Sequence, residues 1–205
     1  MGVYDRFLLP RLIDCACGIR LIGQQRALLV PGAEGRVLEV GAGSGLNFPF
    51  YNRQRVRELL ALEPSAELRR MASSTADAVS LPVTFLDASA EEIPMDAGSM
   101  DTVVITYTLC SIADADKGLA EIRRVLKPNG RLLFAEHGRA PEPAVRRWQD
   151  RLTPVWKRIA GGCHLNRDIP GLITAAGFAL ETLDARYLSR PKAFAFNYRG
   201  QAAAC

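Results

Sequence analysis

The sequence lacks a hydrophobic run long enough to cross a bilayer, which takes about 20 consecutive apolar residues. Its most apolar terminal segment, residues 7–22, is interrupted by a proline, by charged residues and by a glycine. Such a segment could lie on a membrane surface or cover a pocket, but its pattern excludes a crossing. We therefore expect at most a peripheral membrane contact through this N-terminal segment.

Metal-ligating side chains are scarce and poorly spaced. The chain has 2 histidines and 5 cysteines. Cys15 and Cys17 lack the spacing of a zinc knuckle, and Cys163 and His164 are adjacent rather than spaced as metal ligands. The sequence therefore predicts no metal site. Because the cysteine number is odd and no secretion signal is present, we expect reduced thiols in a cytoplasmic protein.

A strong charge of one sign is also missing. The formal net charge is +4 over 205 residues, and basic residues are scattered without interleaved aromatic residues. No nucleic-acid partner is expected from this pattern. Hydrophobic residues make up 48% and charged residues 23% of the chain, which is typical of a globular protein, and the length suits a single domain. The sequence leaves the oligomeric state open.

The most informative segment runs from Val37 to Gly45. A short apolar run containing Glu39 ends in three alternating glycines, Gly41, Gly43 and Gly45. Glycines let the backbone turn sharply beside a ligand, and a helix after the turn would present free N–H groups to a nucleotide-like cofactor. A dinucleotide fingerprint requires glycine where Leu46 stands, so the spacing disfavours an NAD(P)-dependent oxidoreductase without eliminating it.

Two other nucleotide or catalytic motifs are excluded at this turn. No Gly-Lys-Ser/Thr sequence follows it, as a phosphate-binding P-loop requires. Ser44 has a glycine directly on each side, whereas a nucleophile elbow needs an intervening residue between the serine and each glycine.

Strand and helix patterns alternate along the chain, which predicts a parallel sheet with helices on both faces. Strands are expected at 36–40, 58–62, 83–86, 102–106 and 131–135, and in a terminal hairpin at 179–183 and 192–198. Helices are expected within 1–30, from 47, from 65, from 114 or 116, at 143–160 with a break at Pro154, and at 168–176. Residues 127–130 are expected to form a turn.

Chemically distinctive residues follow the expected strands at the carboxyl edge, where ligands bind in open α/β sheets. Glu63 ends the second strand, where a carboxylate can accept hydrogen bonds from ribose hydroxyls. Ala90 and Glu91 are favoured over Asp87 for holding an adenine edge. His137 ends the fifth strand and is a candidate general base, although a structural histidine is about equally compatible.

Taken together, the chain resembles class I S-adenosylmethionine (SAM)-dependent methyltransferases of the methyltransferase type 11, ubiquinone-biosynthesis-like kind. The resemblance is carried by five motifs in order: Val37–Asn47, Leu62-Glu63-Pro64, Ala90-Glu91 before Ile93-Pro94, Asp101–Ile112, and Arg124–Gly130. In the last motif Asn129 replaces a glycine, and asparagine tolerates a left-handed backbone.

A finer similarity links the chain to the branch that includes membrane-associated alkyl-thiol methyltransferases. It rests on Tyr4-Asp5-Arg6, Gly45-Leu46-Asn47 with Tyr51, Leu109-Cys110-Ser111, Glu136-His137, and Trp156–Ile159 before Gly161-Gly162-Cys163. This similarity implies a small methyl acceptor with a thiol, hydroxyl or quinol-like group. A SAM-binding module without catalytic activity remains an alternative.

The resemblance implies a doubly wound three-layer α/β sandwich, whose seven-stranded, mostly parallel sheet receives one antiparallel strand from the terminal hairpin at about 179–198. It implies one domain over 1–205, with a helical cap at 1–33 and a helical insert at 141–177 over the acceptor pocket. The implied cofactor-binding residues are Glu39, Gly41, Ala42, Gly43, Gly45, Asn47, Glu63, Pro64, Ala90, Glu91, Thr106 and Tyr107. The implied acceptor-binding residues are Tyr4, Tyr51, Cys163 and His164, and His137 is the implied base for a hydroxyl or amine acceptor, whereas a thiol acceptor needs no strong base.

Overall fold

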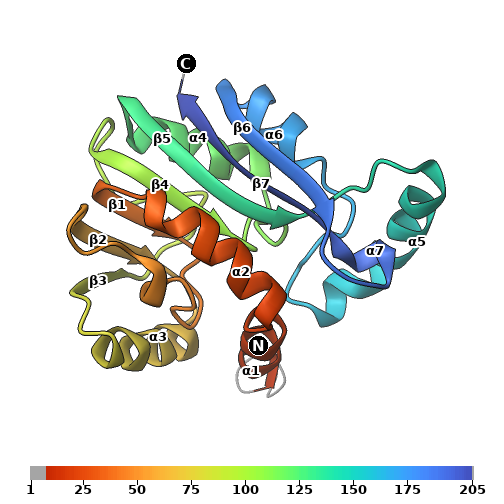
Figure 1. Ribbon diagram of the computed structural model, residues 1–205, viewed down its shortest axis with the longest axis horizontal. Coiled ribbons are helices and arrows are strands. Elements are labelled where there is room, and N and C mark those ends of the chain that lie inside the picture. The colour runs from red at the N-terminus through yellow and green to blue at the C-terminus, as the bar shows by residue number, and fades with distance from the viewer. Residues whose placement is uncertain (1–7, 205) are drawn as a thin grey trace.

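The computed structural model describes residues 8–204, which are built around one seven-stranded sheet (Figure 1). Its strand order is β3-β2-β1-β4-β5-β7-β6, and β7 alone runs in the opposite direction to the other strands. The strands are β1 (Gly35–Val40), β2 (Val56–Leu62), β3 (Val83–Leu86), β4 (Met100–Thr106), β5 (Leu126–His137), β6 (Phe178–Tyr187) and β7 (Phe196–Ala204). This order confirms the predicted fold class.

Each central strand supplies side chains to both faces of the sheet, because successive residues of a strand point to opposite sides. Leu38 and Val40 of β1 join the hydrophobic core on one face, whereas Val37 joins the core on the other. In β4, Val103 and Val104 divide in the same way, and both are fully buried. The uninterrupted apolar runs in the sequence therefore mark strands that are covered on both sides.

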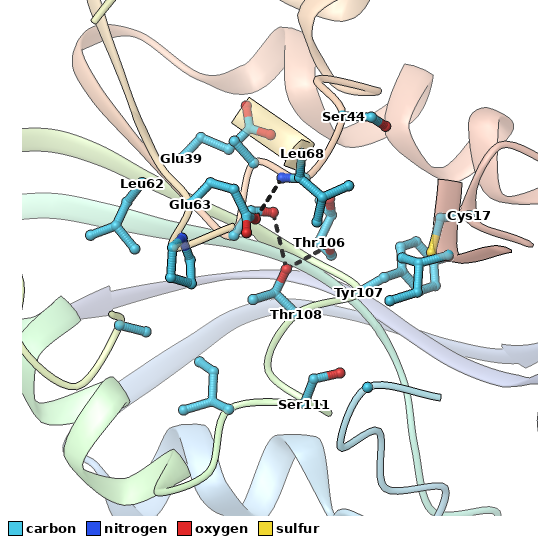
Figure 2. A pocket seen from close by; sticks show the side chains of 18 of the residues that line it. Cys17, Glu39, Ser44, Leu62, Glu63, Leu68, Thr106, Tyr107, Thr108 and Ser111 are labelled. Atoms are coloured by element: carbon cyan, nitrogen blue, oxygen red, sulfur yellow. Dashed lines mark hydrogen bonds between the residues drawn. The ribbon is translucent and has the colours of Figure 1, made fainter. Parts of the chain in front are cut away.

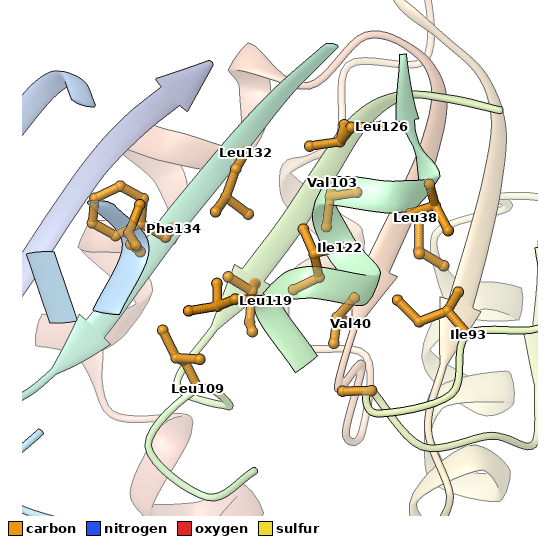
Figure 3. Close-up of a cluster of buried hydrophobic side chains, with 14 of the residues drawn as sticks. Leu38, Val40, Ile93, Val103, Leu109, Leu119, Ile122, Leu126, Leu132 and Phe134 are labelled. Atoms are coloured by element: carbon orange, nitrogen blue, oxygen red, sulfur yellow. The ribbon is translucent and has the colours of Figure 1, made fainter. Parts of the chain in front are cut away.

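Helices cover the two faces as separate layers (Figure 1). The α-helices of the described residues are α1 (Leu9–Cys17), α2 (Arg20–Leu29), α3 (Ala66–Ala78), α4 (Ala115–Val125), α5 (Pro143–Ile159), α6 (Ile169–Ala175) and the short α7 (Lys192–Ala195). Leu119 and Ile122 of α4 pack against Leu38 and Val40, as Figure 3 shows, while Leu29 of α2 joins the opposite core. Helical spacing of apolar residues thus places one face of α2 and one face of α4 on the sheet.

No α-helix follows the glycine turn, contrary to the prediction. Residues Phe48–Phe50 form a single 3-10 turn, and β2 begins soon afterwards at Val56. Phe48 is 2% exposed and Tyr51 is 6% exposed, so the aromatic segment 48–51 packs into the core and does not continue as a helix. Backbone N–H groups at the glycine turn therefore belong to the turn itself and not to a helix N-terminus.

Three predicted boundaries were also wrong. Residues 127–130 belong to β5 instead of a turn, and Asn129 does not have a positive φ angle. Helix α5 runs through Pro154, which lies on the exposed side, where one missing hydrogen bond does not end the helix. The last strand begins at Phe196, because residues 192–195 form α7.

The predicted helical cap corresponds to α1, α2 and the 3-10 turn at Val30–Gly32. Among residues 8–204, no helix is both long and apolar enough to pass through a membrane. Leu12 on α1 is half exposed, and a peripheral membrane contact through this helix stays a prediction.

Candidate functional site

A pocket of about 360 Å³ lies at the carboxyl edge of β1, β2 and β4. Its floor and sides come from the loops after these strands, and α1 and α2 cover it with Ile13, Asp14, Cys17 and Arg26. In Figure 2, Glu39 and Glu63 lie on one side of the pocket, and Cys17 lies beside Tyr107 on the other. The parallel strands bring these residues together because their carboxyl ends share one edge of the sheet.

The three glycines of the turn have different roles. All three have positive φ angles. A Cβ atom on Gly43 would have nothing within 4 Å, so its backbone borders open pocket space. A Cβ on Gly41 would lie 2.2 Å from Thr108, and one on Gly45 would lie 2.7 Å from the Phe48 ring. Gly45 does not line the pocket and serves close packing, which differs from its predicted cofactor contact.

Glu63 points toward the glycine turn from the end of β2. The Gly43 N–H donates to its Oε2 at 3.0 Å, and the Ser65 N–H donates to its Oε1 at 2.9 Å. Each carboxylate oxygen can accept a further hydrogen bond. Burial raises the pKa of Glu63 against the lowering effect of these two N–H groups. The carboxylate is thus fixed in direction while it keeps acceptor capacity on the pocket side.

Glu39 is the centre of a buried hydrogen-bond network beneath the pocket. Its Oε1 accepts from Asn47 Nδ2 at 3.0 Å, and its Oε2 accepts from the Tyr51 hydroxyl at 2.7 Å. Asn47 Nδ2 also donates to Thr106 Oγ1 at 2.9 Å. Burial raises the pKa of Glu39 to about 7. Glu39 therefore links the glycine turn, through Asn47, to Thr106 of β4 and, through Tyr51, to the aromatic segment 48–51.

Arg26 was missed by the sequence analysis. Its Nη1 donates to the carbonyl of Cys17 at 2.6 Å, and its guanidinium lies 5.3 Å from the centre of the Tyr107 ring. Arg26 is 4% exposed, and neither its Nε nor the Tyr107 hydroxyl has a hydrogen-bond partner. Both residues line the pocket, and Tyr107 is held at a φ of 54°, which few non-glycine residues adopt. Two buried donor atoms, Arg26 Nε and the Tyr107 hydroxyl, therefore have no acceptor from the described part of the chain.

The loop after β3 lines another part of the pocket. Ala90 is buried there, and the Glu91 carboxylate accepts the Asp114 N–H at 3.3 Å, which ties the loop to α4. Asp87, the alternative adenine partner, does not line the pocket, because its carboxylate pairs with Arg69 at 2.7 Å.

The pocket brings together nearly all the predicted cofactor-binding positions. Those that line it are Glu39, Gly41, Ala42, Gly43, Asn47, Glu63, Pro64, Ala90, Glu91, Thr106 and Tyr107. The predicted acceptor residues lie elsewhere: Tyr51 is buried against Glu39, while Cys163 and His164 stand outside the lining, and Tyr4 falls outside the described residues. Of the predicted insert at 141–177, Gly161 reaches the pocket.

His137 does not line this pocket either. Its Nε2 lies 3.0 Å from Cys163 Sγ, in a small cluster behind the loop that follows β4. Its role as a general base toward an acceptor therefore stays a prediction, without support from the geometry of the pocket.

Comparison with known proteins agrees with this arrangement. A family model described as a methyltransferase domain matches residues 38–134. A thiol S-methyltransferase TMT1B of Rattus norvegicus is 37% identical over 152 residues, which cover 72% of this chain and 62% of the relative. A demethylmenaquinone methyltransferase of Thermus thermophilus is 32% identical over 142 residues, covering 69% of this chain and 64% of that protein.

The chain belongs to the class I SAM-dependent methyltransferases. This confirms the family predicted from the motifs, and SAM is the cofactor of that family. A solved SAM-dependent methyltransferase of Thermotoga maritima, a possible histamine N-methyltransferase, shares the fold at a TM-score of 0.70 and 19% identity over 98% of each chain. The chain spans about three fifths of the length of the rat relative.

The hydrogen-bond donors and acceptors that line the pocket suit SAM. The Glu63 carboxylate suits ribose hydroxyls, and the open backbone at Gly43 leaves room for a ligand beside the main chain. The partnerless Arg26 Nε and Tyr107 hydroxyl suit a carboxylate such as that of the methionyl group. Among residues 8–204, five buried side-chain atoms have no partner, and these two donors belong to residues that line the pocket, where a ligand could complete them.

Proposed function

We propose that this protein transfers the methyl group of SAM to the thiol of a small molecule. The observation that carries the proposal is the polarity of the pocket, with a ribose-type acceptor at Glu63 and unpaired donors at Arg26 and Tyr107. When bound, SAM supplies a methyl group on a positively charged sulfur, which a nucleophile can attack in line.

The residues of the chain would act mainly by alignment and exclusion of water. Glu63 would hold the ribose, Ala90 and Glu91 would border the adenine, and Arg26 would hold the carboxylate. Helix α1 covers the pocket through Asp14, whose carboxylate accepts a hydrogen bond from Ser44. Alignment of reactants alone can supply much of the rate acceleration for such a transfer.

A thiol acceptor is favoured over a hydroxyl by the acidity of thiols, by the groups that line the pocket and by the name of a relative. Thiols ionise near pH 8.5, so they need a weaker base than alcohols do. Among the described residues that line the pocket there is no histidine, and the Glu39 carboxylate already accepts hydrogen bonds from Asn47 and Tyr51. Burial raises the pKa of Tyr107, so its hydroxyl would act as a donor rather than a base. The name of the rat relative points to the same acceptor class.

The proposal can be tested with SAM carrying a labelled methyl group and four acceptors: a thiol, an alcohol and an amine on one alkyl skeleton, and a quinol. We expect label in the thiol product, with transfer strongly reduced in Glu63→Ala. The matched control is Glu67→Ala on α3, where the carboxylate pairs with Arg70 away from the pocket.

Each other outcome contradicts a defined part of the proposal. Transfer to the quinol alone would reject the thiol and favour the chemistry named for the Thermus relative. Binding of S-adenosylhomocysteine without transfer to any acceptor would support a non-catalytic SAM-binding module. Failure to bind SAM would reject the site itself.

A further inference from the structure

Three side chains that are far apart in the sequence lie close together next to the pocket, although none of them lines it. Cys110, His137 and Cys163 place their ligand atoms, two sulfurs and one imidazole nitrogen, within 4.8 Å of one another. They come from the loop after β4, the end of β5 and the segment after α5. Cys110 is 2% exposed, whereas Cys163 is partly exposed, which leaves a route from solvent to the cluster.

From this geometry, we propose that Cys110, His137 and Cys163 form a binding site for a thiophilic divalent metal ion, with Zn²⁺ as the best match. Zinc holds thiolate sulfur at about 2.3 Å and imidazole nitrogen at about 2.0–2.1 Å in a tetrahedron. Those bond lengths place the donors of a bound ion roughly 3.5–3.8 Å apart. The observed spacing requires only small side-chain movements to reach that geometry.

The charge balance also favours a divalent ion. Binding would release the protons of the two thiols to solvent and form two metal–sulfur bonds and one metal–nitrogen bond. Two thiolates and a neutral imidazole around Zn²⁺ make a neutral site, which suits a buried position. Among residues 8–204 no further cysteine, histidine or carboxylate joins the group, so one tetrahedral position is left for water or another ligand.

The loop carrying Cys110 is held rigidly in place. The buried Glu136 carboxylate accepts the backbone N–H groups of Thr108, Leu109 and Cys110 at 2.7, 2.8 and 3.4 Å. The His164 N–H donates to the Cys110 carbonyl at 2.9 Å, which joins the two cysteine-bearing segments directly. Hence the folded backbone brings the ligands together without help from an ion.

A further donor faces the sulfur of Cys163. Trp156 Nε1 donates to Cys163 Sγ at 3.2 Å. Hydrogen bonds from outer groups to ligating atoms orient them and tune the affinity of metal sites. Ser111, whose hydroxyl lies 3.4 Å from Cys110 Sγ, also lines the SAM pocket, so the proposed ion would lie directly behind that pocket.

The experiment uses the full chain, reduced and freed of metal, and then titrated with Zn²⁺ against a chromophoric chelator and separately with Co²⁺. We expect one equivalent of either ion and the thiolate-to-cobalt absorption of a tetrahedral sulfur-ligated site. Cys163→Ser and His137→Gln should each weaken binding by at least about 100-fold, and Trp156→Phe by about tenfold.

Two matched variants serve as controls. Cys15→Ser removes an exposed thiol of α1, and His164→Gln removes an imidazole that is not one of the three ligands while it keeps the backbone N–H that bonds to the Cys110 carbonyl. Both should keep the metal affinity. Binding of S-adenosylhomocysteine, measured in parallel, separates loss of metal from loss of fold.

The proposal is overturned if the reduced protein binds neither ion, or if Cys163→Ser and His137→Gln bind as the wild type does. Formation of a Cys110–Cys163 disulfide without metal affinity after reduction would equally reject it. None of these outcomes depends on methyl transfer, so the metal site and the proposed function can fail separately.

Discussion

Two sides of the pocket differ in how their buried polar atoms are satisfied. On the turn side, formed by the ends of β1 and β2, the carboxylates of Glu39 and Glu63 accept hydrogen bonds from the protein itself. On the cap side, formed by α1, α2 and Tyr107, Arg26 Nε and the Tyr107 hydroxyl have no partner. The turn side leaves one buried acceptor, Asn47 Oδ1, without a partner, whereas the cap side leaves two buried donors, so folding satisfies the buried donors of the turn side but not those of the cap side.

This contrast predicts that the largest loss of stability follows a change on the turn side. In Glu39→Ala, the Tyr51 hydroxyl loses its acceptor, Glu39 Oε2, and Asn47 Nδ2 loses one of its two acceptors. Each unpaired buried donor costs about 1–3 kcal/mol, so we expect the free energy of unfolding to fall by about 2–4 kcal/mol. Urea denaturation of the ligand-free protein measures this loss.

The matched change on the cap side is Arg26→Met, which keeps much of the volume of the side chain. It removes one hydrogen bond to the Cys17 carbonyl and also removes a buried donor that has no partner. We expect less than half of the destabilisation seen in Glu39→Ala. Equal losses in the two variants would remove the distinction between the two sides.

The second largest effect is expected on the cap side, where a substitution should lower the affinity for S-adenosylhomocysteine. Arg26→Met should weaken S-adenosylhomocysteine binding about tenfold or more, because a charge-assisted hydrogen bond to the carboxylate is lost. Binding of methylthioadenosine, which lacks the amino-acid portion, should stay unchanged in the same variant. Calorimetry of both ligands measures the difference directly.

Arg11→Met is the control for this experiment, since Arg11 is an exposed residue of α1 outside the pocket lining. It should bind both ligands as the wild type does. If Arg26→Met weakened both ligands equally, Arg26 would act through the shape of the pocket instead of through the carboxylate.

The turn side could be predicted from sequence because its determinants are local. A buried strand, alternating glycines and a carboxylate at the next strand end have fixed spacings, and parallel strands place them at one edge. The helix expected after Gly45 was wrong for a reason also present in the sequence. Pro49 disfavours a helical backbone at Phe48, and the segment between that glycine and β2 buries Phe48 and Tyr51 in a 3-10 turn instead.

The cap side and the cysteine–histidine cluster could not be predicted in the same way. Arg26 reaches the pocket because α2 crosses the face of the sheet, and no short motif specifies that crossing (Figure 1). Likewise, Cys163 meets His137 across the fold, whereas the sequence only shows it beside His164. Three separate segments of the chain supply this cluster, so adjacency in sequence does not reveal it.

The smallest expected effect is a pH dependence that belongs to the turn side alone. Burial raises the pKa of Glu39 from 4.5 to about 7, so the folded protein holds this proton more tightly than the unfolded chain does. The associated stability is fully present below pH 4.5 and is lost as the pH rises through about 7. Between pH 6 and pH 8 the wild type should lose about 1 kcal/mol that Glu39→Gln, which cannot ionise, keeps.

Urea denaturation of both ligand-free proteins at pH 6, 7 and 8 measures this difference. Subtracting the Glu39→Gln curve removes the contributions of other titrating groups, such as His137, that the two proteins share. Parallel curves would mean that Glu39 is ionised throughout this range in the folded protein. The hydrogen bonds from Asn47 and Tyr51 would then outweigh burial, and the turn side would be held by a charged rather than a neutral carboxyl group.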